Sequence, residues 1–211
     1  MALEWLLSIV APPLCWSCGR LAPAGAPLCA RCRLRLRWLG PEAVTVAGVP
    51  AWAPVAYEGP ARALVQALKF RGAAGVAEPM AAQMAAGAPT RLLERAVLVP
   101  VPLHPVRLRQ RGFNQAERLA ASVARRTGLP CMPCLERRGG GAPQVGRHRV
   151  ARLTAVRDSI HVGRDLDAPH RALLVDDVIT TGGTLSACAS ALRAGGTRDV
   201  AALAYARTLG R

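Results

Sequence analysis

The stretch RALLVDDVITTGGT, residues 171–184, decides the fold that we predict for this chain. Residues 172–175 form an apolar run whose length and bounding turn signals are typical of a strand buried on both faces. The run ends in two carboxylates, Asp176 and Asp177, and a Thr/Gly-rich loop then leads into an apolar helical pattern over residues 185–192. The order strand, acidic pair, loop and helix predicts an open α/β sheet.

The same stretch predicts a binding site, because ligands of open α/β sheets lie beyond the carboxyl ends of the strands. Gly182 and Gly183 allow the backbone to approach a ligand closely, and successive N–H groups at a helix start bind an anion. Hydroxyl donors come from Thr180, Thr181 and Thr184. The carboxylate pair repels phosphate, but it can accept hydrogen bonds from sugar hydroxyls or hold Mg²⁺ through water. A ribose 5-phosphate fits both halves.

Two other interpretations fit part of the stretch 171–184. The first is an ordinary buried strand and helix joined by a glycine turn. The second is a Walker B strand, which also ends in carboxylates but requires a GxxxxGK[ST] loop elsewhere. The only lysine, Lys69, has no such loop around it, so the Walker interpretation fails.

Composition indicates a globular protein with anionic partners. The chain has 211 residues, 51% of them hydrophobic, and a net charge of +15 from 28 basic and 13 acidic residues. This charge favours phosphorylated metabolites, nucleic acid or both, although arginine richness can also reflect the composition of a genome. Arginine suits bidentate contacts to phosphate better than lysine does.

The N-terminus predicts a small appendage and no secretion signal. Residues 1–11 are apolar but carry Glu4 and no basic region, and they are too short to span a bilayer. We expect an amphipathic helix there and a cytoplasmic protein without a membrane span. Gly40-Pro41 marks a domain boundary, with residues 1–40 before it and residues 41–211 after it.

Four cysteines in two CxxC pairs predict a structural zinc site. Cys15 and Cys18 lie ten residues before Cys29 and Cys32, so that each pair occupies one tight turn and two turns complete a tetrahedron. Disulfides or unrelated cysteines are the alternatives. Four thiolates would leave no open position for a substrate on the metal.

Other cysteines and arginines have less specific patterns. Arginines alternate with leucines over residues 31–37, which as a strand would have one basic and one apolar face, either for nucleic acid or simply solvated. Cys131 and Cys134 fall in residues 129–135, which we interpret as a strand, so their side chains would point to opposite faces and share no metal. Cys188 is expected in the core.

The middle of the chain alternates strands with helices. We expect strands over residues 49–57, 96–101, 159–162 and 200–205, a helix from Pro60 to about Lys69, a core helix over residues 73–87 and a helix over residues 116–124. Lys69 and Arg71 either end a helix as solvated charges or face an anion. The proline-rich turn that contains His104 precedes Arg107, Arg109 and Arg111, a spacing suited to a polyanion.

The chain resembles a known family through motifs that follow one another along nearly its whole length. The stretch 171–184 closely resembles the phosphoribosyl diphosphate (PRPP) loop of type I phosphoribosyltransferases. The combination is similar to the ComF family of competence-related, phosphoribosyltransferase-like proteins. The matching motifs are the two CxxC pairs, KFRG at 69–72, VPVPLHP at 99–105, RGFNQ at 111–115, PQVG at 143–146 and VDDVITTGGT at 175–184.

This resemblance implies a fold and a set of roles. The fold would be a Rossmann-like parallel sheet flanked by helices, with a small N-terminal zinc ribbon. Asp176 and Asp177 would bind the ribose 2′ and 3′ hydroxyls, and residues 180–184 would cradle the 5-phosphate. The diphosphate would lie near His104, Arg107, Arg111, Lys69 and Arg71. Residues 137–153 would form a flexible hood over the substrate.

Two functions of different class follow. The first is transfer of a phosphoribosyl group from PRPP, with Mg²⁺, to a nitrogen acceptor that the sequence does not identify. The second is a non-catalytic module that binds single-stranded DNA during DNA uptake, with competence proteins as partners. No aromatic stacking platform for the second function is evident in the sequence.

Overall fold

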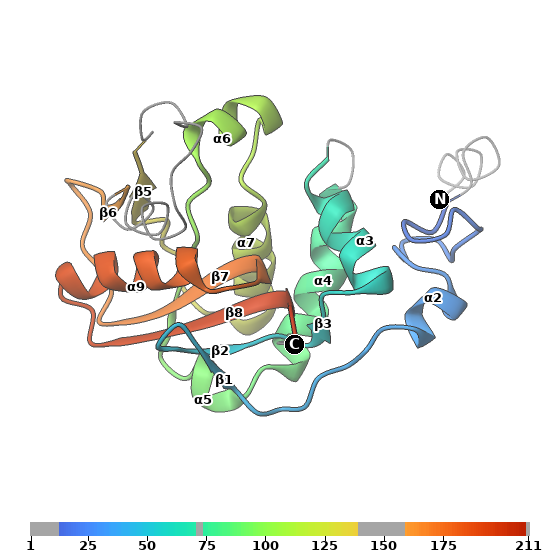
Figure 1. Cartoon of the computed structure of the whole chain (residues 1–211), viewed down its shortest axis with the longest axis horizontal. Coiled ribbons are helices and arrows are strands. Elements are labelled where there is room, and N and C mark those ends of the chain that lie inside the picture. Colours follow the sequence, from blue (N-terminus) through green and yellow to red (C-terminus); the bar gives the residue numbers. More distant parts are fainter. Residues whose placement is uncertain (1–12, 71–73, 139–158, 210–211) are drawn as a thin grey trace.

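The fold is built on a sheet that is mostly parallel, as Figure 1 shows for the whole chain. The structure is a computed structural model that describes residues 13–70, 74–138 and 159–209. The strand order is β1-β2-β8-β7-β4, with β3 also paired to β8, and only β1–β2 is antiparallel. The strands are β1 (Val44–Val46), β2 (Val49–Trp52), β3 (Val55–Ala56), β4 (Val97–Pro100), β7 (Arg171–Ile179) and β8 (Asp199–Arg207).

Helices cover both faces of the sheet (Figure 1). One face packs against α3 (Gly59–Leu68), α4 (Ala74–Gly87) and α7 (Gln115–Thr127), and the other packs against α9 (Gly183–Ala194). Two short helices, α5 (Thr90–Leu93) and α6 (Pro105–Arg111), flank β4 along the chain. A separate antiparallel ribbon, β5 (Leu135–Arg137) with β6 (Ile160–Val162), lies against α9. The expected α/β class is therefore confirmed.

Strand β7 is an interior strand of the sheet, with β4 paired on one side and β8 on the other. Its side chains alternate between the two faces, as the period of a strand requires. Leu173 belongs to the core under α3, α4 and α7, while Leu174 belongs to the core under α9. The predicted apolar run is confirmed as a strand buried on both faces, but the strand continues through the acidic pair to Ile179.

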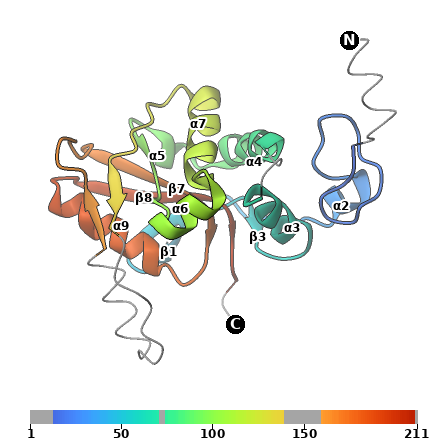
Figure 2. The ribbon, with the colours of Figure 1, turned by 90° about the horizontal axis from the view of Figure 1, so that it is seen from above.

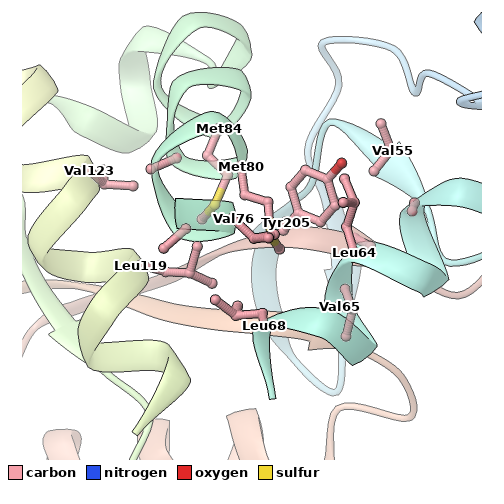
Figure 3. Close-up of a cluster of buried hydrophobic side chains, with 14 of the residues drawn as sticks. Val55, Leu64, Val65, Leu68, Val76, Met80, Met84, Leu119, Val123 and Tyr205 are labelled. Atoms are coloured by element: carbon pink, nitrogen blue, oxygen red, sulfur yellow. The ribbon is translucent and has the colours of Figure 1, made fainter. Parts of the chain in front are cut away.

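The core under α3, α4 and α7 holds the largest buried side chains. Figure 3 shows Met80 and Met84 of α4 beside Leu119 of α7 and Leu64 of α3. Tyr205 of β8 is completely buried among them. This packing confirms the expectation that the Ala/Met-rich segment of α4 is core, and it fixes the ends of α3 and α7 against the sheet.

The segment 49–57 forms two short strands, and not the single strand that we expected. Both β2 and β3 pair parallel with β8, through Ala51 opposite Ala202 and Val55 opposite Ala206. Between the two strands lies Pro54, which has no N–H to donate to a ladder. The break follows from that missing donor.

The expected strand over residues 129–135 is also wrong for most of its length. Only Cys131 bridges Leu98 of β4, with Met132 N–H donating to the Leu98 carbonyl at 2.8 Å. Pro130 and Pro133 flank this bridge and offer no N–H groups, so the ladder stops and β5 begins at Leu135.

The cysteine-rich module lies at one end of the molecule, beside α3 (Figure 2). The expectation of a strand over residues 31–37 is wrong, because residues 30–34 form helix α2 (Ala30–Leu34). Leu36 is buried in the same core as α3 and α4, whereas Leu34 is 85% exposed. A single turn of helix places the second cysteine pair on one side, and the arginines around it face solvent.

Several predictions fall outside the described residues. They are the N-terminal helix, Arg71 and most of the hood. Of the hood, Arg137 is described, and it ends strand β5. Among the helices of the described residues, none has the length and apolar character needed to cross a bilayer.

Candidate functional site

The two carboxylates of β7 face opposite sides of the sheet. Asp177 is 3% exposed and lies on the side of α3, α4 and α7, where Lys69 Nζ is 2.9 Å from its Oδ2. Asp176 lies on the side of α9, where its charge affects the buried thiol of Cys188. The carboxylate of Asp176 also accepts the backbone N–H of Asp177 at 2.8 Å. The two carboxylates therefore have different neighbours on the two faces of the sheet, although their side chains are close enough to interact with each other.

Lys69 and Arg111 both lie near Asp177, although they come from different helices. Lys69 ends α3 and Arg111 ends α6. Burial lowers the pKa of Arg111, and the negative charge of Asp177 opposes that shift. The structure thus brings Lys69 of KFRG, Arg111 of RGFNQ and the acidic pair together near the carboxyl end of β7, where an α/β sheet binds its ligands.

Each residue of the RGFNQ motif has a visible structural role. Arg111 donates to the side-chain carbonyl of Gln115. Gly112 ends α6 with a positive φ of 79°, and Phe113 lies under the guanidinium of Arg118, 3.6 Å from ring centre to charge. Asn114 caps α7 through Ala116 N–H and donates to the Val101 carbonyl at 3.0 Å. The motif therefore holds Arg111 in place and ties α7 to β4.

A second group of cations lies toward α9 and β5. His104 begins α6, and its Nδ1 accepts the Val106 N–H at 3.3 Å. Burial lowers the pKa of His104, and the positive charges of Arg137, Arg107 and Arg109 lower it further. The neutral imidazole is therefore favoured in the free protein. Arg107 also lowers the pKa values of Arg111 and Arg137, so its charge reaches both groups.

The Thr/Gly loop turns sharply from β7 into α9. Gly182 has a positive φ of 78°, and a Cβ there would lie 2.6 Å from Val46 Cγ1 of the β1–β2 turn. Only glycine satisfies both conditions. Thr180 and Thr181 are exposed, and the first N–H groups of the twelve-residue α9 follow directly. The loop has the geometry of an anion cradle.

The surroundings of Asp176 disfavour the charged form of its carboxyl group. Burial raises its pKa well above the usual value, and the neighbouring charge of Asp177 raises it further. The charge of Lys69 acts in the opposite direction, with a smaller effect. Asp176 therefore favours a proton more strongly than an exposed aspartate does, unless a ligand supplies a cation or hydroxyl donors.

The four cysteines of the N-terminal module form one cluster. Their sulfur atoms all lie within 4.8 Å of one another, and the sulfurs of Cys18 and Cys29 are 3.7 Å apart. Burial raises the pKa of Cys15, but backbone N–H groups of Cys29, Ser17 and Cys18 outweigh it and lower that pKa to about 6. The cluster has the residues and spacing to hold a metal ion such as zinc.

The other three cysteines take no part in such a cluster within the described residues. Cys134 belongs to the core under α9, whereas Cys131 is exposed at the surface. Cys188 is completely buried on α9, as expected.

The predicted diphosphate ligands therefore divide between two places, and the roles of three supporting residues were not predicted. Lys69 and Arg111 lie by Asp177, while His104 and Arg107 lie toward β5. Asn114 and Gln115 belong to the RGFNQ motif and Arg137 begins the predicted hood, but the individual roles of these residues were not predicted. A capping signal, Asn before a helical pattern, could have indicated Asn114, but no local pattern indicates that Arg137 lies near α6.

Comparison with known sequences gives three relatives, each similar over about half of the chain. Competence protein F of Haemophilus influenzae is 32% identical over 113 residues, which are 52% of this chain and 49% of that protein. Competence protein ComFC of Streptococcus pneumoniae is 31% identical over 109 residues, 52% of this chain and 47% of that protein. Adenine phosphoribosyltransferase of Streptomyces clavuligerus is 38% identical over 106 residues, 50% of this chain and 56% of that protein.

The resemblance to the ComF family is confirmed over that half of the chain. The chain spans about half the length of the curated relatives it matches. No family model matches it.

Among solved structures, glutamine PRPP amidotransferase from B. subtilis aligns with 66% of this chain and 30% of its own, at 20% identity and a TM-score of 0.45. A hypoxanthine phosphoribosyltransferase from Staphylococcus aureus aligns with 65% of this chain and 61% of its own, at 12% identity and a TM-score of 0.32.

Proposed function

We propose that the protein binds PRPP with Mg²⁺ and transfers its phosphoribosyl group to a nitrogen acceptor. One observation carries the proposal: Lys69, Arg111 and Asp177, from three separate motifs, meet near the carboxyl end of strand β7. The anion-binding loop that follows β7 lies next along the chain. Cations, carboxylates and a phosphate cradle are the three chemistries that a phosphoribosyl diphosphate requires.

Each part of the substrate has a counterpart in the site. The N–H groups at the start of α9 and the hydroxyls of Thr180, Thr181 and Thr184 would hold the 5-phosphate. Asp176 and Asp177 would accept hydrogen bonds from the ribose hydroxyls. For the Asp177 carboxylate to do so, Lys69 would leave it and approach the diphosphate. Arg107 and Arg111 would bind the diphosphate from the side of α6.

The reaction would break the bond between ribose C1 and the diphosphate oxygen. Both bonding electrons leave with the diphosphate, and the lone pair of the acceptor nitrogen forms the new bond to C1 before that nitrogen loses its proton. The chain's cations would stabilise the negative charge that grows on the leaving group, and the loop would fix the sugar in line with it. Carboxylates are the oxygen ligands that Mg²⁺ prefers, and the ion would add further positive charge to the diphosphate.

The test is a calorimetric titration with PRPP and Mg²⁺, with ribose 5-phosphate and ATP as comparison ligands. We expect PRPP to bind more tightly than ribose 5-phosphate because it adds the diphosphate contacts, and ATP to bind weakly because its sugar and phosphates are joined differently. Failure of PRPP to bind would reject the proposal. Where PRPP binds, candidate bases follow, and the name of the third relative makes adenine the first to test.

We also propose that the cysteine cluster holds one structural zinc ion per chain. Zinc–sulfur bonds of about 2.3 Å place tetrahedral sulfurs about 3.8 Å apart, close to the separation of Cys18 and Cys29. Elemental analysis should find about one zinc per chain, and a Cys18→Ser/Cys29→Ser variant should lose it. The Cys131→Ser variant is the control and should keep its zinc. A folded wild-type protein without metal would contradict this assignment.

A second candidate function, binding of single-stranded DNA by the cysteine module, gains support from two tryptophans. Trp16 and Trp38 are 47% and 54% exposed, and Arg31, Arg33 and Arg35 in the same N-terminal part of the chain are exposed as well. Exposed aromatic rings beside cations are the elements of a stacking surface for unpaired bases. The names of two relatives suggest competence proteins as partners for this function. An oligonucleotide titration that shows salt-sensitive binding, without any PRPP binding, would favour it.

A further inference from the structure

Arg137 points into the molecule from the edge of the site. It ends strand β5, where Leu135, two residues earlier on the same face, is buried in the core under α9. Glu136 points the opposite way and lies 3.4 Å from His161 on the outer face of the ribbon. Arg138 is exposed and follows the end of the strand. The alternation therefore turns the Arg137 side chain toward α9.

The buried part of this side chain has no counter-charge. The Nε atom of Arg137 is buried and has no hydrogen-bond acceptor, and no carboxylate of the described residues forms an ion pair with its guanidinium. The group that faces it from α9 is Cys188, whose thiol stays neutral because burial raises its pKa. A buried guanidinium without an acceptor is unfavourable for folding.

The neighbours of Arg137 make that cost larger. Arg107 of α6 lowers the pKa of Arg137, after the larger effect of burial, and Arg137 in turn lowers the pKa of His104. A half-buried guanidinium whose Nε lacks an acceptor thus lies near two further basic side chains from another element. Within the part of the chain that the structure describes, Lys69 differs, because Asp177 already compensates it.

Resting on the proposed function, we propose that Arg137 binds the diphosphate of PRPP together with Arg107 and His104. An anion placed between β5 and α6 would give the orphaned Nε an acceptor and compensate the neighbouring positive charges of Arg137 and Arg107. Arg137 would then hold the leaving group on the α9 side, while Lys69 and Arg111 hold it on the α3 side. In this arrangement Arg137, the first residue of the predicted hood, binds the diphosphate from a defined position at the end of β5.

The experiment compares Arg137→Gln with Arg138→Gln, its exposed neighbour. Affinities for inorganic diphosphate, PRPP and ribose 5-phosphate are measured by calorimetry, and melting temperatures are measured without ligand. Arg137→Gln should weaken diphosphate and PRPP binding about tenfold or more, as expected for charged hydrogen bonds, and leave ribose 5-phosphate affinity unchanged. Its melting temperature should be equal to or above that of the wild type. Arg138→Gln should resemble the wild type in every measurement.

The outcomes separate this inference from the proposed function. If the wild type binds PRPP and Arg137→Gln binds diphosphate equally well, the Arg137 assignment is wrong and the proposed function stands. A lower melting temperature with unchanged affinities would make Arg137 a structural residue. Diphosphate binding that depends on Arg137, without PRPP binding, would support the anion site and reject the sugar site. Arg137→Lys should recover part of the affinity, because it restores the charge without the planar guanidinium.

Discussion

The two carboxylates near the end of strand β7, buried Asp177 and half-buried Asp176, have different partners. On the face of α3, Asp177 has a cation 2.9 Å away, and the ion pair exists before any ligand arrives. On the face of α9, Asp176 forms no ion pair within the described residues, and the charge of Arg137 lies beyond the neutral thiol of Cys188. On the face of α3, Lys69 compensates the charge of Asp177. On the face of α9, Asp176 and Arg137 are not paired with each other.

This difference predicts that a ligand stabilises the two faces of β7 by different amounts. A ligand that meets Asp177 must first displace Lys69, so part of its binding energy replaces an existing interaction. A ligand that meets Asp176 and Arg137 supplies partners that the free protein lacks. The second face is therefore expected to be less stable without ligand and more strongly stabilised by it.

The largest effect is expected for Asp177→Asn. Loss of the carboxylate removes the acceptor for the ribose hydroxyl and leaves Lys69 without its partner. PRPP affinity should fall by roughly a hundredfold or more, as for a charged group at the centre of a binding site. Calorimetry measures the change, with exposed Asp167→Asn as the control. Equal PRPP affinity in Asp177→Asn and the wild type would contradict the assignment of this carboxylate to the sugar.

The compensated face can be tested next through Lys69→Met. This change removes the ion-pair partner of buried Asp177, so the free energy of unfolding should fall by roughly 1–3 kcal/mol, less than for a fully buried pair because Lys69 is partly exposed. Denaturant unfolding measures it. The double variant with Asp177→Asn should recover most of the loss, since no unpaired charge remains. A double variant no more stable than Lys69→Met would show that the ion pair is not the cause.

The smallest expected effect is a gain of stability in Asp176→Asn. Burial and Asp177 raise the pKa of Asp176, so the folded protein holds a proton that the unfolded chain has released. The folded state then binds more protons above the pKa of the unfolded chain, and stability falls as the pH rises toward the raised pKa. Asp176→Asn should therefore raise the melting temperature at pH 7, with a smaller gain as the pH falls toward 4.

A lower melting temperature for Asp176→Asn at pH 7 would contradict this reasoning. It would mean that the carboxylate has a partner in the free protein, and the two faces of β7 would then not differ in the way described. Asp167→Asn again serves as the control, because it lies on the surface and should not alter the pH dependence.

Local patterns in the sequence were sufficient for much of the fold and for part of the site. Strand β7, its loop and helix α9 were predicted because their signals lie within one short segment. Prolines explain the errors: Pro54, Pro130 and Pro133 each remove an N–H that the expected strands needed. The helix at residues 30–34 was missed because alternating Arg and Leu also fits a strand.

Features that depend on a few neighbouring residues could be predicted from the sequence alone. Two CxxC turns suffice to bring four sulfurs within 4.8 Å, and a strand followed by Gly182 suffices to start α9 with free N–H groups. Which charged side chains lie next to each other is visible only in the tertiary structure, because it depends on the packing of elements that are distant in the sequence. The tertiary structure placed Lys69 on Asp177, and it turned Arg137 toward α9 and away from solvent. Alternation along a strand separates neighbouring residues onto opposite faces, and only the helices packed on each face determine what those residues contact.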